Sequence, residues 1–147
     1  MRFMMLMIPG VYQGEGQDWE KIAKADFTPP AEAVERMMRY NEELAKAGAL
    51  ISLDGLHPPT TAARVSFAGG KPTVTDGPFT ESKEVLGGYW IIKVKTREEA
   101  IEWAKRVPAD NGDVIEIRQV FEVEDWPEDA RKAAVNPTVK AAVEKHR

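Results

Sequence analysis

The stretch that decides the fold is residues 72–92, which read PTVTDGPFTESKEVLGGYWII. It begins with a short predicted strand, residues 73–75, that ends in the turn Asp76-Gly77-Pro78. An Asp can bond its own backbone, a Gly tolerates positive φ and a Pro fixes φ, so each residue favours a turn. After a polar loop, Gly87-Gly88 leads into the apolar run Tyr89–Val94, which is typical of a buried strand. The turn is interpreted either as purely structural or as part of a functional site.

Outward from this stretch, the hydrophobic periodicity predicts strands alternating with helices. The expected strands are residues 3–8, 50–53, 64–68, 71–75, 87–95 and 112–123, and the expected helices are 30–48 and 96–108. Gly69-Gly70 supplies positive φ for a hairpin, and Thr96 with Glu99 has the spacing of a capping box. This order of elements is the split βαβ pattern of a ferredoxin-like α+β fold with an added hairpin.

Two amphipathic patterns predict which side chains reach the core. In the first helix the apolar face consists of Val34, Met37, Met38, Leu44 and Ala45. We therefore expect the Met37-Met38 pair to pack in the core. In the last strand the expected inward residues are Ile115, Ile117, Phe121 and Val123, and the outward ones are Glu116, Arg118 and Glu122.

Two segments lie outside this core pattern. Residues 10–30 form a polar insert, in which a short helix after Asp18 is expected, and the insert is either a lid over a site or a decoration. Beyond Trp126-Pro127 the chain turns helical, with a break at Asn136-Pro137 that can cap a second helix. We therefore expect a domain at residues 1–125 and a helical C-terminal extension at 126–147, which packs on the domain or on a partner subunit.

Composition excludes several classes of function. The chain has 147 residues, 43% of them hydrophobic, which is enough for one core. Its net charge of −4 argues against nucleic-acid binding, and the absence of cysteine excludes disulfides and thiolate sites. With His57 and His146 as its only histidines and no glycine-rich phosphate loop, we expect neither a metal nor a cofactor.

The apolar N-terminus superficially resembles a signal peptide, but a first strand explains the same residues better. No run reaches the roughly 18 apolar residues that a membrane span requires. The expected location is therefore the cytoplasm, with no membrane partner.

The central stretch also carries a family resemblance. Asp76-Gly77-Pro78-Phe79, followed by Glu84 and Leu86-Gly87-Gly88-Tyr89, resembles the signature of the DGPF-motif branch of the YCII-related family. Asp54–Pro58 upstream, with Ala100, Trp103 and Ala104, then Val114, Glu116 and Arg118 downstream, fits the same pattern. The resemblance implies a ferredoxin-like domain that pairs as a homodimer into a dimeric α+β barrel. It also implies a link to sigma-factor regulation, because genes of this family often lie beside those for extracytoplasmic-function sigma factors.

General acid–base chemistry is the remaining catalytic option. His57 follows one strand and Asp76 ends another, so the two could meet at one end of the sheet and form a general base. The alternatives are a loop histidine bonded to backbone and an Asx turn. Arg118 could hold a carboxylate or enolate, or form a salt bridge within its strand. Tyr12 and Tyr89 are candidate hydrogen-bond donors to a substrate, or core residues.

Better-understood relatives in the wider family resemble cofactor-free lyases or isomerases that use a His–Asp pair, whose His belongs to the first helix. In this chain Met37 occupies about that place. His57 is then a substitute from another position. On the family resemblance, we expect a homodimer that binds a small anionic or phenolic molecule and catalyses cofactor-free lyase or isomerase chemistry. The alternative is a non-catalytic ligand-binding or regulatory module.

Overall fold

The computed structural model describes residues 1–13, 18, 29–79 and 84–145. The strands are β1 (Arg2–Ile8), β2 (Leu50–Gly55), β3 (Ala63–Ser66), β4 (Thr73–Asp76), β5 (Gly88–Lys93) and β6 (Val114–Gln119). The α-helices are α2 (Ala31–Lys46), α3 (Arg97–Lys105), α4 (Glu128–Ala133) and α5 (Pro137–Lys145). The helix expected after Asp18 lies outside the described residues. None of the helices in these ranges is long and apolar enough to cross a membrane.

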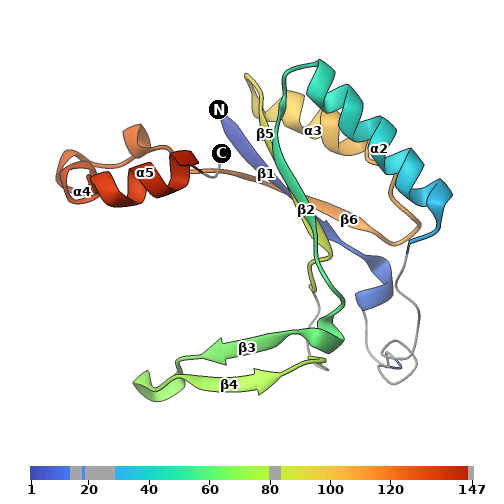
Figure 1. The fold of residues 1–147 in the computed structure, drawn as a ribbon, viewed down its shortest axis with the longest axis horizontal. Coiled ribbons are helices and arrows are strands. Elements are labelled where there is room, and N and C mark those ends of the chain that lie inside the picture. The colour runs from blue at the N-terminus through green and yellow to red at the C-terminus, as the bar shows by residue number, and fades with distance from the viewer. Residues whose placement is uncertain (14–17, 19–28, 80–83, 146–147) are drawn as a thin grey trace.

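Four strands form one antiparallel sheet in the order β2-β5-β1-β6, with β1 at its centre. Helices α2 and α3 cover one face of this sheet, and the other face is uncovered (Figure 1). Strands β3 and β4 form a separate two-stranded sheet. The molecule is thus an α+β domain whose order of elements is compatible with the expected ferredoxin-like fold.

The core lies between the two helices and the covered face. Because side chains alternate along a strand, Phe3 and Met5 of β1 point into this core, and Met4 and Leu6 point to the uncovered face. The register places two cross-strand rows on that face. They are Ser52–Ile91–Met4–Arg118 and Asp54–Tyr89–Leu6–Glu116.

The inward face of α2 differs from the expected one. Its buried residues are Tyr40, Asn41 and Leu44, and Met37 packs partly against the core. Met38 is 58% exposed, so the expectation that it packs in the core was wrong. The helix is rotated so that the stripe through Met37, Tyr40, Asn41 and Leu44 faces the sheet, and this stripe includes side chains with polar atoms.

The last strand is shorter than expected. β6 ends at Gln119, and Ile115 and Ile117 pack against the core as predicted. Phe121 is 72% exposed and Val123 is also exposed, so their predicted inward positions were wrong. Apolar and polar residues still alternate in the sequence after Gln119. This alternation does not separate two faces of a strand there, because the chain has already left the sheet.

The predicted caps and turn glycines are largely confirmed. The Thr96 hydroxyl accepts a hydrogen bond from the Glu99 amide at 3.1 Å, and the Glu99 carboxylate accepts one from the amide of Lys95 rather than that of Thr96. Gly69 and Gly70 both have positive φ in the turn between β3 and β4. The Asn136 side chain caps α5 by accepting bonds from the amides of Thr138 and Val139.

Two parts of the chain project from the domain. We call residues 63–76 the hairpin and residues 121–145 the C-terminal arm. Figure 1 shows both extending to the side opposite α2 and α3, at different ends of the sheet. Arg2 fixes the start of the C-terminal arm, because its Nε and Nη2 donate to the two carboxylate oxygens of Glu122 at 2.8 and 2.9 Å. These bonds raise the pKa of Arg2.

Candidate functional site

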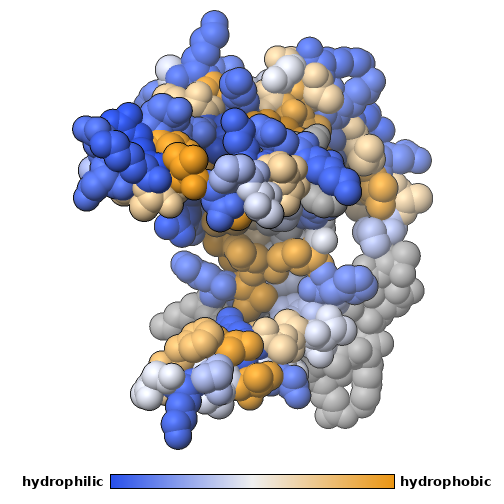
Figure 2. Space-filling view, turned by 60° about the vertical axis from the view of Figure 1, so that its left-hand side comes forward, coloured by the Kyte–Doolittle hydropathy of each residue, from blue (hydrophilic) through white to orange (hydrophobic). Residues whose placement is uncertain are grey.

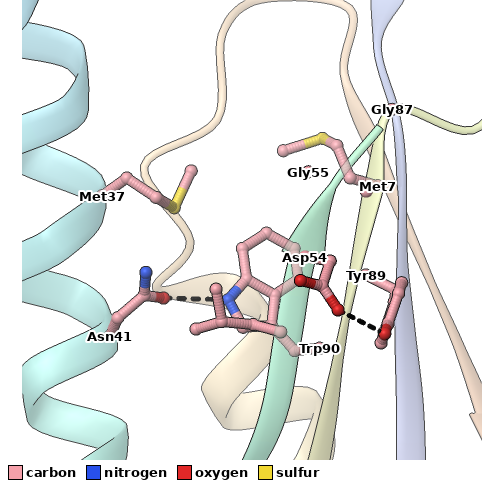
Figure 3. A pocket seen from close by; sticks show the side chains of 10 residues that line it. Met7, Met37, Asn41, Asp54, Gly55, Gly87, Tyr89 and Trp90 are labelled. Atoms are coloured by element: carbon pink, nitrogen blue, oxygen red, sulfur yellow. Dashed lines mark hydrogen bonds between the residues drawn. The ribbon is translucent and has the colours of Figure 1, made fainter. Parts of the chain in front are cut away.

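A cavity of about 170 Å³ lies between α2 and the ends of β2 and β5. Its apolar walls are the side chains of Met7, Met37, Leu53 and Trp90 (Figure 3). These residues come from three strands and one helix, so the cavity exists only when α2 is packed on the sheet.

One polar contact orders the wall of the cavity. The indole N–H of Trp90 donates to Oδ1 of Asn41 at 2.9 Å, and both residues are buried (Figure 3). The Tyr40 ring meets the Trp90 ring edge-on, with centroids 6.1 Å apart. Because a buried indole N–H without a partner is costly, Asn41 fixes the plane of the Trp90 ring in the cavity wall.

A carboxylate and a phenol of the residues that line the cavity point away from it, to the uncovered face of the sheet. The Tyr89 hydroxyl donates to Oδ2 of Asp54 at 2.6 Å (Figure 3). This hydrogen bond, with smaller effects of burial and of the Asp54 charge, raises the pKa of Tyr89. The phenol therefore stays protonated at neutral pH, and Asp54 is available as an acceptor.

The glycines at the mouth allow a close approach of the backbones. A Cβ at Gly87 would lie 2.4 Å from Cγ of Pro9, and one at Gly88 would lie 2.8 Å from the carbonyl oxygen of Asp54. The Gly87 amide also donates to the Met7 carbonyl at 2.8 Å. Gly87-Gly88 is thus required by the geometry of this edge of the sheet.

The turn Asp76–Phe79 has a structural role that the structure shows directly. The Gly77 amide donates to the Ala62 carbonyl at 2.7 Å, and a Cβ at this position would lie 2.0 Å from the carbonyl oxygen of Pro59. The Arg64 guanidinium lies 3.8 Å from the centroid of the Phe79 ring. The turn therefore fastens the base of the hairpin to residues 59–62.

His57 and Asp76 do not form the pair that the acid–base hypothesis requires. Both side chains are exposed, His57 in the loop after β2 and Asp76 at the end of β4. No hydrogen bond or ion pair joins either side chain to another residue in the described ranges, and neither lines the cavity. Their catalytic role stays a prediction.

Of the other residues proposed from the sequence, Tyr89 lines the cavity. Arg118 lies exposed on the uncovered face with its Nε 3.8 Å from the Glu116 carboxylate, which is the salt-bridge alternative. Tyr12 is buried in the turn Gly10–Tyr12, where burial raises its pKa, and is not part of the lining. Within the described ranges, no group of three or more His, Asp or Glu side chains could hold a metal ion.

Sequence reasoning missed Asn41 and Asp54 as parts of a site. The available signal for Asn41 was its place between Met37 and Leu44, on an otherwise apolar stripe of the helix. Asp54 was noticed only as part of a motif, because its pairing with Tyr89 depends on the register of β2 and β5.

The fold and the site together define a small α+β domain with a cavity between its first long helix and the sheet. A comparison with protein families adds that the model of the YCII-related domain matches residues 1–124, and the chain belongs to this family. Uncharacterized protein R00369 of Rhizobium meliloti (strain 1021) is 36% identical over 75 residues. That match covers 48% of this chain and 60% of the relative's length.

Proposed function

We propose that this YCII-related domain binds a small aromatic molecule in the cavity beside Trp90. The observation that carries the proposal is the cavity of about 170 Å³, with apolar walls and a few fixed polar groups. This is the usual make-up of a small-molecule site. An apolar cavity of roughly 150 Å³ is large enough to bind benzene, so one ring is a suitable size.

The polar groups favour a neutral phenol over an anion. Asp54 belongs to the lining although its side chain points to the uncovered face, and no lysine or arginine of the described chain is in the lining. A ligand hydroxyl can bond the side-chain amide of Asn41 in the lining, whereas a ligand carboxylate would be repelled by the nearby Asp54 charge with no cation to balance it. Of the two ligand classes expected from the sequence, the cavity therefore supports the phenolic one.

Cofactor-free acid–base chemistry belongs to the same proposal. Because His57 and Asp76 lie outside the cavity, the nearest pair with suitable chemistry is Asp54 and Tyr89, joined at 2.6 Å on the uncovered face of the sheet. In this role Asp54 would be the base and Tyr89 the residue that holds its carboxylate in place.

The dimeric α+β barrel and the DGPF branch are also parts of this proposal. The uncovered face offers Met4, Leu6 and Ile91 at its centre, which is what a second sheet could bury. Membership of the DGPF-motif branch is supported by the glycines of its motif. A side chain at Gly77, Gly87 or Gly88 would clash with neighbouring atoms, so these motif positions have a structural reason to be glycine.

A non-catalytic regulatory module is the second candidate. It is favoured by the exposed apolar side chains of the C-terminal arm, such as Val135 and Val139, which are suited to contact another protein. This candidate does not require an occupied cavity.

The test uses methionine methyl groups as reporters. With ¹³C-methyl methionine, phenol is expected to shift the NMR signals of Met7 and Met37 and to leave those of the exposed Met1 and Met38 unchanged. Benzoate, of similar size but anionic, should bind at least tenfold more weakly, and Asp54→Asn should reduce this difference.

A matched pair of variants completes the test. Met37→Trp fills the cavity and should abolish the shift of the Met7 signal, whereas Met38→Trp changes the exposed neighbour and should not. Circular dichroism checks that both variants are folded. The proposal fails if phenol moves no cavity methyl signal, or if the two variants bind phenol equally.

A further inference from the structure

The cavity beside Trp90 contains a buried polar side chain. Asn41 of α2 is 5% exposed and lies in the lining together with Met37 and Trp90. Several apolar side chains of the hairpin and the C-terminal arm, such as Phe67 and Val135, are instead open to water, and Figure 2 shows hydrophobic patches on both parts. Because a hydrogen bond shielded from water is stronger than an exposed one, the polar atoms of Asn41 have a large influence on which ligand binds in the cavity.

The hydrogen bond to Trp90 fixes the direction in which the Asn41 amide faces. An indole N–H is a donor only, so the amide atom 2.9 Å from it is the oxygen Oδ1. The nitrogen Nδ2 therefore faces away from the indole N–H. Figure 3 shows the oxygen turned to Trp90 and the nitrogen turned toward Met37, which also lines the cavity. Asn41 thus presents a hydrogen-bond donor to the cavity.

This donor contacts a weak acceptor. Within the described part of the chain, the partner of Nδ2 is Sδ of Met38, at 3.8 Å. A thioether sulfur accepts weakly, and the amide nitrogen of Asn41 has two hydrogens to place. At least one N–H of a buried side chain therefore has no good partner, which is costly in free energy and uncommon in folded proteins. An acceptor atom on a ligand would satisfy it.

The other polar groups of the described lining have partners or point elsewhere. The side chains of Asp54 and Tyr89 bond each other on the uncovered face. The Gly87 amide donates to the Met7 carbonyl at 2.8 Å, and the backbones of β2 and β5 are paired in the sheet. The polar atom through which this lining can select a ligand is therefore Nδ2 of Asn41.

We propose that Asn41 is the specificity-determining residue of the cavity, and that the ligand is a neutral aromatic molecule whose carbonyl oxygen accepts a hydrogen bond from Nδ2. This inference rests on the proposed function, because the ring of the ligand occupies the same cavity. It adds the chemical class of the group that the ring carries.

A carbonyl oxygen suits this donor better than a hydroxyl does. It has no hydrogen, so it brings no donor of its own into the cavity. A hydroxyl oxygen also accepts the bond from Asn41, but its hydrogen then needs an acceptor. Met7 and Met37 line the cavity with thioether sulfurs, which accept weakly. Phenols are therefore ligands, and aromatic ketones and aldehydes complement the cavity more fully.

The carbonyl stretch of a bound ligand tests the hydrogen bond in the natural chain. The probe is acetophenone labelled with ¹³C at its carbonyl carbon, and shifts of the Met7 and Met37 methyl NMR signals report that it occupies the cavity. A hydrogen bond to the oxygen lowers the stretching frequency, so we expect the infrared band of the bound ligand below that of acetophenone in cyclohexane.

The outcomes separate this inference from the proposed function. A bound band at the cyclohexane frequency, or no methyl shift with acetophenone, would overturn the inference and leave a phenol site standing. If phenol also shifts neither methyl signal, the proposed function fails with it.

A pair of variants assigns the hydrogen bond to Asn41. Trp90→Phe, and Trp90→Phe combined with Asn41→Leu, both lack the indole N–H, so neither leaves it without a partner, and the second also lacks the amide. α-Methylstyrene, in which C=CH₂ replaces C=O, is the hydrocarbon control for acetophenone. We expect the added Asn41→Leu to weaken acetophenone relative to α-methylstyrene about fivefold, the effect of one net hydrogen bond. Circular dichroism checks that both variants are folded, and an unchanged ratio of the two dissociation constants would contradict the role of Asn41.

Discussion

Asn41 shows how one side chain links packing to the candidate site. It is a buried polar residue of α2, and its carbonyl oxygen accepts the hydrogen bond of the Trp90 indole. The same Trp90 ring forms a wall of the cavity. A change at Asn41 should therefore affect both stability and the shape of the site.

We expect Asn41→Ala to lower the free energy of unfolding by about 1–3 kcal/mol, because it leaves the buried N–H of Trp90 without a partner. The measurement is urea denaturation followed by circular dichroism. In a Trp90→Phe background the same substitution should cost about 1 kcal/mol less, since no indole N–H remains to be satisfied. Equal costs in the two backgrounds would show that this hydrogen bond does not contribute.

Single residues with local roles were predictable from the sequence. Thr96 and Asn136 cap helices as expected, since a cap depends on residues within one turn. The cavity residues were not predictable in this way. Of the five residues put forward, Tyr89 lines the cavity, because which side chains meet there depends on how α2 packs on β5.

At the scale of elements, the hairpin is the clearest case of partial prediction. Its strands and its glycine turn were predicted, because alternation and Gly69-Gly70 are local signals. Its projection away from the domain was not predictable. The valines Val65 and Val74 lie opposite each other as in a strand pair with an apolar face, and both are exposed in the structure.

The attachment of the hairpin depends on Gly77. We expect Gly77→Ala to lower the free energy of unfolding by about 1–3 kcal/mol, because the new Cβ would meet the Pro59 carbonyl oxygen. Gly55→Ala is the matched control, since a Cβ there meets nothing within 4 Å. Thermal denaturation of the two variants measures the difference. If both are as stable as the natural chain, the turn does not fasten the hairpin.

At the scale of the whole molecule, Tyr40 couples stability to pH. It lies where α2 and α3 meet on the sheet, and its hydroxyl donates to the Trp103 carbonyl at 3.0 Å. Burial raises its pKa to about 12, partly offset by the charge of Arg106. The folded state therefore holds this proton more tightly than the unfolded state does, whose tyrosines have a pKa near 10.

We expect this contribution to be fully present below about pH 10 and to be lost as the pH rises toward about 12. The measurement is the free energy of unfolding in urea at pH values from 9 to 12. The slope should be shallower in Tyr40→Phe than in the natural chain. Identical slopes for the natural chain and Tyr40→Phe would contradict the assignment.

The central position of β1 has a consequence for the protein during its synthesis. Strand β1 leaves the ribosome before the other strands of this sheet, and it pairs with β5 and β6, which are the last two of them. At roughly 5–20 residues per second, its apolar side chains wait on the order of ten seconds for their partners. The nascent chain therefore exposes Phe3, Met5 and Ile8 until translation has passed Gln119, and apolar surface exposed in this way favours aggregation before the sheet is complete.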